Sequence, residues 1–137
     1  AFTYFQPTCH FGTTIMSQDF RKLHVNWLCG HDVNRTLDYT NPEVQAYMGQ
    51  VFRAMRGAID GMMVDYCDAL WEYEACNGGF SDAHATSTSF YRTFFRLAKN
   101  GLGPYSWLHE RNLNDPNNDL TLGFVDSQRI SADTARI

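Results

Sequence analysis

Amphipathic and uniformly apolar segments alternate along this chain, and that order constrains the fold more than any other feature. Residues Pro42–Arg56 carry apolar side chains at helical spacing, with Thr40 or Asn41 as the cap and Pro42 in the first turn. The apolar run Ala58–Tyr66 follows and is typical of a strand buried on both faces. A helix joined to such a strand indicates a parallel α/β sheet.

The same alternation continues on both sides of this pair. An aromatic-faced helix is expected over residues 83–99, with Asn100 and Gly101 ending it. The further predicted strands are Leu102–Leu108, Leu120–Val125, Leu23–Leu28 and the weaker Phe2–Phe5.

Composition argues against several classes of protein. The net charge is −4 and no run of Lys or Arg occurs, so no nucleic-acid partner is expected. No stretch of about 18 apolar residues is present, so no membrane span is expected. The four cysteines form no C-x-x-C pair, so we expect no metal and no other cofactor; a Cys67–Cys76 bridge is geometrically conceivable but not established by sequence.

Two short motifs have plain interpretations. The Asn34-Arg35-Thr36 sequon has meaning only in a secreted protein, so the compartment stays open, with secretion or the periplasm favoured. Asp115–Asp119 is rich in oxygen ligands but lacks the glycine and final Glu of a calcium loop, which favours a solvated turn.

Ionisable residues follow the predicted strands. The C-terminal ends of parallel strands are where barrel enzymes build active sites, although open doubly wound sheets place ligands there too. No nucleotide-binding glycine motif is present. Three predicted strands are followed by such residues. They are Asp65 and Asp68 at the end of Ala58–Tyr66, His109, Glu110 and Arg111 after Leu102–Leu108, and Asp126, Arg129 and Asp133 after Leu120–Val125.

Two of these carboxylates suit glycosidic bond cleavage. That reaction usually needs one carboxyl group that attacks or activates water and one that protonates the leaving oxygen. Asp65 ends a buried strand, and Asp133 lies 68 residues later (133 − 65), which is two β/α steps in this interpretation. Both side chains are therefore expected at one mouth of the sheet.

The surrounding sequence resembles the α-galactosidase clan of glycoside hydrolases, families 27 and 36 and more distantly 31. In that clan an apolar strand ends in Asp, often followed by Cys and a second Asp, and an Arg-x-x-x-Asp segment follows two strands later. The matching stretches are Val64-Asp65-Tyr66-Cys67-Asp68, Arg129–Asp133 and the family 36-like segment Leu37–Val44, and the resemblance spans roughly residues 20 to 133.

The resemblance implies a retaining glycoside hydrolase within a (β/α)8 TIM barrel. Asp65 would be the nucleophile, Asp133 the general acid/base and Arg129 a sugar contact. Glu110 stands near a sugar-contacting position of family 27. Galactosidases of the clan usually carry a sugar-binding lysine two residues before the nucleophile. This sequence has Met63 at that position, which departs from the pattern for galactose recognition. Trp71 and Asp68 complete the expected substrate-binding set, although core packing and a structural role are their simpler interpretations.

Structural roles are the alternatives at most of these positions. Asp65 and Asp133 also suit helix caps, and Glu110 with Arg111 also suits a surface ion pair. His109 is then a hydrogen-bonding neighbour, and Trp27, predicted to end a strand, is core by default.

A whole barrel needs about 250 residues. Residues 1–137 are therefore expected to be a fragment of a single catalytic TIM-barrel domain, about four β/α units, completed by the remainder of the barrel, another chain or a second copy. The expected substrate is an oligo- or polysaccharide with α-linked galactosides or related α-glycosides. The alternatives are a transglycosylase of the same clan, like raffinose synthase, a non-catalytic carbohydrate-binding or scaffold fragment, and an unrelated parallel α/β enzyme.

Overall fold

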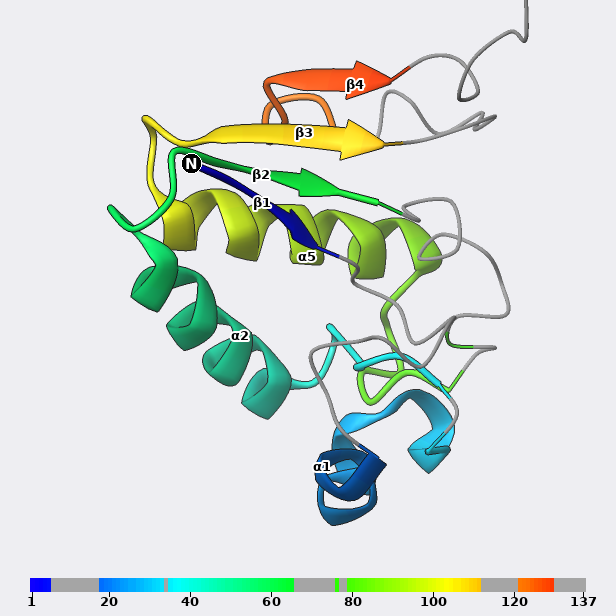
Figure 1. Cartoon of the computed structure of the whole chain (residues 1–137). Helices are drawn as coiled ribbons and strands as arrows, with labels where there is room; N and C mark the ends of the chain where they lie inside the picture. Colours follow the sequence, from blue (N-terminus) through cyan, green and yellow to red (C-terminus); the bar gives the residue numbers. More distant parts are fainter. Residues whose placement is uncertain (6–17, 34, 66–75, 77–78, 112–120, 130–137) are drawn as a thin grey trace, which may run out of the picture.

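Four parallel strands form one sheet whose spatial order is the chain order (Figure 1). The computed structural model describes residues 1–5, 18–33, 35–65, 76, 79–111 and 121–129. Each new strand adds at the same edge of the sheet, which confirms the predicted parallel α/β arrangement. The strands are β1 (Phe2–Phe5), β2 (Gly61–Val64), β3 (Trp107–Arg111) and β4 (Ser127–Arg129).

Helices α2 (Pro42–Met55) and α5 (Ser87–Leu102) lie on one side of the sheet (Figure 1). The Asn41 side chain accepts a hydrogen bond of 2.9 Å from the Glu43 amide, so α2 begins at Pro42, as the sequence predicts. Thr86 and Ser89 form a reciprocal capping box that begins α5. No helix in the described part of the chain is long and apolar enough to cross a membrane.

The two long helices pack closely because Gly101 has no side chain. A Cβ added at Gly101 would lie 2.3 Å from Cβ of Phe52. Arg56, which follows α2, donates hydrogen bonds to the carbonyls of Asn100 and Gly101, at 2.6 and 2.8 Å.

The prediction that α5 ends at Asn100 and Gly101 is wrong. The helix runs on to Leu102, and Gly103 ends it with φ of 98°.

The predicted strand at Leu23–Leu28 is wrong. Helix α1 (Gln18–Leu23) and the short helices η1 (Val25–Trp27) and η2 (Cys29–His31) occupy this region. The aromatic rings of Phe20, His24 and Trp27 recur at helical spacing, and neighbouring centroids lie 4.4 and 4.3 Å apart. The apolar period of this segment is therefore helical.

The last two predicted strands are displaced toward the C-terminus. Leu102 belongs to α5, and a turn closed by the Ser106 amide on the Gly103 carbonyl delays β3 until Trp107. Leu120–Val125 is also not a strand where it is described, because the amides of Phe124 and Val125 donate to the Thr121 carbonyl in a turn. Strand β4 begins only at Ser127.

The two faces of the sheet differ in what covers them. Side chains alternate along each strand, and Met62, Val64 and Leu108 point to the helices and are fully buried. No described helix lies on the other side, which we call the open face (Figure 1). Its aromatic side chains remain exposed, with Phe2 at 64% and Trp107 at 49%. By register, the open face comprises Phe2, Tyr4, Met63, Asp65, Trp107, His109, Arg111, Ser127 and Arg129.

Candidate functional site

Asp65 lies at the C-terminal end of β2, on the open face, and is only 7% exposed. Two side chains from the neighbouring strands bind the same carboxylate oxygen. The Tyr4 hydroxyl of β1 donates a short hydrogen bond to Oδ2, and Nη1 of Arg111 in β3 lies 2.9 Å from it. The sequence prediction that a carboxylate follows this strand is confirmed, and the carboxylate is held from both sides.

Three successive strands contribute one row of charges at this edge. The register pairs Val64 with Glu110 and Arg111 with Arg129, so the position after Val64 is level with both arginines. The row therefore reads Asp65, Arg111, Arg129 across β2, β3 and β4. Because β3 and β4 begin later than predicted, the arginines end their strands instead of following them.

His109 lies one row deeper on the open face. Its Nδ1 is 2.7 Å from Oγ of Ser127, so the predicted role as a hydrogen-bonding neighbour is confirmed. Burial lowers the pKa of His109 from its ordinary value, and the positive charges of Arg129 and Arg111 lower it further. The imidazole is therefore neutral at pH 7, and the cations of this face are the two arginines. Met63 occupies the same row, paired with His109.

Glu110 does not belong to this site. It points to the helix-covered face and is fully buried, because alternation along β3 sends it away from its neighbours His109 and Arg111. Its carboxylate accepts hydrogen bonds from Tyr91 of α5, from Thr121 at 2.5 Å and from Gln128 of β4 at 2.7 Å. The predicted sugar contact is therefore corrected to a structural role.

The alternative of a surface ion pair between Glu110 and Arg111 is also wrong, since Arg111 pairs with Asp65. Asp126 likewise lies away from the site, before β4 begins. Its Oδ2 is 2.6 Å from Nζ of Lys99 and accepts the Leu108 amide at 2.8 Å. This carboxylate connects α5 to the beginning of β3.

Sequence reasoning missed Tyr4 as a partner of the candidate nucleophile. Its signal was present in the predicted strand Phe2–Phe5, whose alternation places Tyr4 on one face. The sequence separation of 61 between Tyr4 and Asp65 hides their contact from any local pattern. Trp27 is not at a strand end: its Nε1 donates to Glu43 at 2.6 Å, and its ring packs against Tyr47 with centroids 5.3 Å apart.

Several predicted site residues lie outside the described residues. They are Asp133, Asp68, Trp71 and the Asp115–Asp119 turn. The structure therefore brings together Asp65, Arg111 and Arg129 of the predicted set. The spacing of Asp133 from Asp65 stays a prediction.

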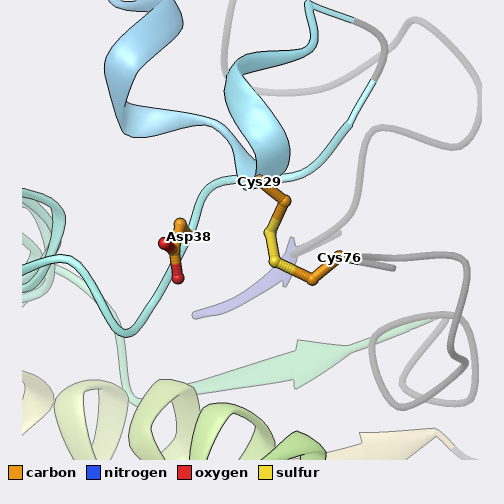
Figure 2. Close-up of side chains that lie close together, drawn as sticks. All are labelled: Cys29, Asp38 and Cys76. Atoms are coloured by element: carbon orange, nitrogen blue, oxygen red, sulfur yellow. A yellow bond between two sulfur atoms is a disulfide. The ribbon is translucent and has the colours of Figure 1, made fainter. Parts of the chain in front are cut away.

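Cys29, Asp38 and Cys76 form a buried group of metal-ligand type (Figure 2). Cys29 and Cys76 are joined in a disulfide across 47 residues, so their sulfurs are bonded to each other, and Cys76 does not pair with Cys67. The Asp38 carboxylate accepts the Thr40 amide and hydroxyl at 2.9 and 2.6 Å, and the Ser81 amide at 2.6 Å. The group fastens the segment before α2 to the segments before α5.

No family model matches this sequence, and no curated protein matches it. Function must therefore be argued from the residues of the site.

Proposed function

We propose that this chain is the middle of a retaining glycoside hydrolase that acts on α-linked galactosides or related α-glycosides. Asp65 is the nucleophile, and Asp133 is the general acid/base. One observation carries the proposal: a shielded carboxylate stands at the C-terminal edge of a parallel sheet, on the face opposite the helices, fixed by Tyr4 and Arg111. Barrel enzymes place their catalytic residues at this edge.

The reaction is a double displacement. Asp65 attacks the anomeric carbon while Asp133 gives its proton to the departing glycosidic oxygen, which leaves a glycosyl ester on Asp65. Asp133 then takes a proton from water, and that water displaces Asp65 from the anomeric carbon. A fixed and oriented carboxylate suits the first step, because attack requires alignment of the reacting atoms.

Strand order supports a barrel as the complete fold. The order β1-β2-β3-β4 never reverses, and α2 and α5 cover one face only, whereas a doubly wound sheet reverses its order and carries helices on both faces. The inward face of a barrel is packed with side chains in layers, and the exposed Phe2, Tyr4 and Trp107 suit such layers. The partner is then the remainder of the barrel, from the same polypeptide, another chain or a second copy.

The substrate-binding residues are Arg129 beside the catalytic row, with Asp68 and Trp71 in the segment that follows Asp65. Met63 lies in the row of His109, one row deeper than Asp65, and is apolar. Galactosidases of the clan that the sequence resembles carry lysine at this position. We therefore propose related α-glycosides beside galactosides as substrates. The buried disulfide favours an oxidising compartment, consistent with a secreted or periplasmic enzyme.

The test is a pair of substitutions assayed in the complete assembly on a panel of α-glycosides. Asp65→Asn should lower kcat by about 10³-fold or more while substrate still binds. Asp133→Asn should slow substrates with poor leaving groups most, should spare aryl glycosides in the first step, and should respond to azide, which replaces the activated water.

Asp32→Asn is the matched control, because Asp32 lies in a partly exposed pair with Arg35 at 3.6 Å and belongs to none of the four strands. Its rates should equal those of the wild type. Wild-type rates for both Asp65→Asn and Asp133→Asn on natural substrate would remove these residues from the mechanism and would leave the non-catalytic binding fragment as the better interpretation.

A further inference from the structure

We infer that Arg111 controls the second half of the reaction by making Asp65 a good leaving group when the glycosyl ester is hydrolysed. The inference rests on the proposed function and deepens it, because it names the residue that balances the two displacement steps. Arg111 acts through Asp65, so it is a positioning residue.

The ion pair is fixed and shielded. Nη1 of Arg111 lies 2.9 Å from Oδ2 of Asp65, and the two side chains are only 21% and 9% exposed. Coulomb attraction at this distance is several times stronger when water is largely excluded than it is on a protein surface. Asp65 directly follows β2 and Arg111 ends β3, two paired strands, so the backbone places the guanidinium beside the carboxylate.

Charge in the row changes during the cycle. In the free enzyme Asp65 is negative and Arg111 and Arg129 are positive. Formation of the ester through Oδ1 removes the negative charge and leaves Oδ2 as the carbonyl oxygen beside Arg111. The guanidinium therefore stabilises the free carboxylate more than the ester, which opposes the first step and favours the second.

The second step returns the charge to Arg111. The water oxygen bonds to the anomeric carbon, and the bond from that carbon to Oδ1 breaks with its electron pair moving to the Asp65 carboxylate. The water proton moves to Asp133. Negative charge develops on Oδ2, where the guanidinium already donates, and such preorganised donors stabilise a transition state strongly.

Tyr4 offers an internal comparison. Its hydroxyl donates to the same Oδ2 but carries no charge, so it supports the carboxylate and the ester carbonyl more evenly. Loss of Tyr4 should therefore disturb the orientation of Asp65 without a selective effect on ester breakdown.

The experiment measures each step in the complete assembly, with an aryl α-glycoside that the wild type turns over. Arg111→Gln should lower kcat by about 10- to 100-fold and should lower KM by at least the same factor, so that kcat/KM stays the same or rises. A burst of aryl release should appear, and intact mass after acid quench should show most of the enzyme as a covalent adduct. Tyr4→Phe should lower kcat/KM without a burst. Arg35→Gln, at an arginine that pairs with Asp32 outside the four strands, should match the wild type.

Each outcome of this experiment either supports the role of Arg111 or overturns it. An Arg111→Gln enzyme that turns over without a burst, with KM unchanged or raised, overturns the role of Arg111 and leaves Asp65 as nucleophile. If circular dichroism shows that Arg111→Gln does not fold, Arg111→Lys replaces it and should show a smaller burst with the same parallel fall in kcat and KM; no burst overturns the inference. Hydrolysis by the wild type with inversion at the anomeric carbon overturns the proposed function, and this inference with it.

Discussion

The covered and open faces of the sheet use the same strands for different purposes. On the covered face Met62, Val64 and Leu108 are fully buried, and the Glu110 carboxylate there is enclosed by hydrogen-bond donors. On the open face Asp65 meets Arg111, and the aromatic side chains remain exposed. Adjacent residues of β3 therefore have opposite roles, since Glu110 holds the fold together and Arg111 holds the candidate nucleophile.

The difference teaches that a residue's type alone does not assign its role. Glu110 and Asp65 are both shielded carboxylates near strand ends, yet only Asp65 lies on the open face, which would be the inward face of the proposed barrel. Substitutions on the covered face should change stability, and substitutions on the open face should change chemistry.

The largest expected effect is on the covered face. Phe94 of α5 is fully buried, and its ring lies 5.9 Å from Phe52 of α2 by centroids. Phe94→Ala removes one of the buried contacts between the two long helices and should lower the free energy of unfolding by about 3–5 kcal/mol. Urea denaturation measures this value. Phe2→Ala, on the exposed edge of the open face, is the control and should change it by less than about 1 kcal/mol; equal losses would erase the distinction between the faces.

An intermediate effect is expected at Glu110. In Glu110→Gln one acceptor oxygen becomes an amide nitrogen that faces either Tyr91 or the pair Thr121 and Gln128, so a buried hydrogen bond is lost. The free energy of unfolding should fall by about 1–3 kcal/mol, again by urea denaturation. Glu43→Gln, at an exposed carboxylate, should shift it by no more than about 0.5 kcal/mol. A neutral Glu110→Gln would contradict the structural assignment.

The smallest expected effect concerns His109 and pH. The folded protein lowers the pKa of His109, by burial and then by Arg129 and Arg111, so the unfolded chain binds more protons as pH falls through the ordinary histidine range. This contribution favours folding at pH above 6.5 and is lost as pH falls. Thermal unfolding between pH 7.5 and about 5 should therefore show a steeper decline for the wild type than for His109→Asn. Identical slopes would mean that neither burial nor the guanidinium charges lower the pKa of His109 in the folded protein.

Local sequence signals predicted the beginning of α2 and the presence of β2. Asn41 and Pro42 fix the beginning of α2 within a few residues, and the apolar run before Asp65 predicts β2. Strand β3 was displaced because α5 continues past Asn100 and Gly101, which act as packing positions against Phe52 and Arg56. That contact spans 45 residues, so no local pattern reports it.

The candidate site was predicted in part for the same reason. Asp65 follows from a strand end, whereas its partners Tyr4 and Arg111 follow only from strand register. The shift of β3 by a few residues decides that Arg111 faces Asp65 and that Glu110 faces α5. The disulfide from Cys29 to Cys76 is likewise set by three-dimensional packing, and the sequence offered only a conceivable Cys67–Cys76 bridge without establishing it.

The decisive measurement is the site of covalent labelling by an activated 5-fluoro glycosyl fluoride in the complete assembly. Peptide mass spectrometry after rapid acid quench should find one glycosyl ester, on Asp65, and none in Asp65→Asn. An ester on another carboxylate, or stoichiometric hydrolysis with inversion and no ester at any position, would contradict the assignment of Asp65 as the nucleophile.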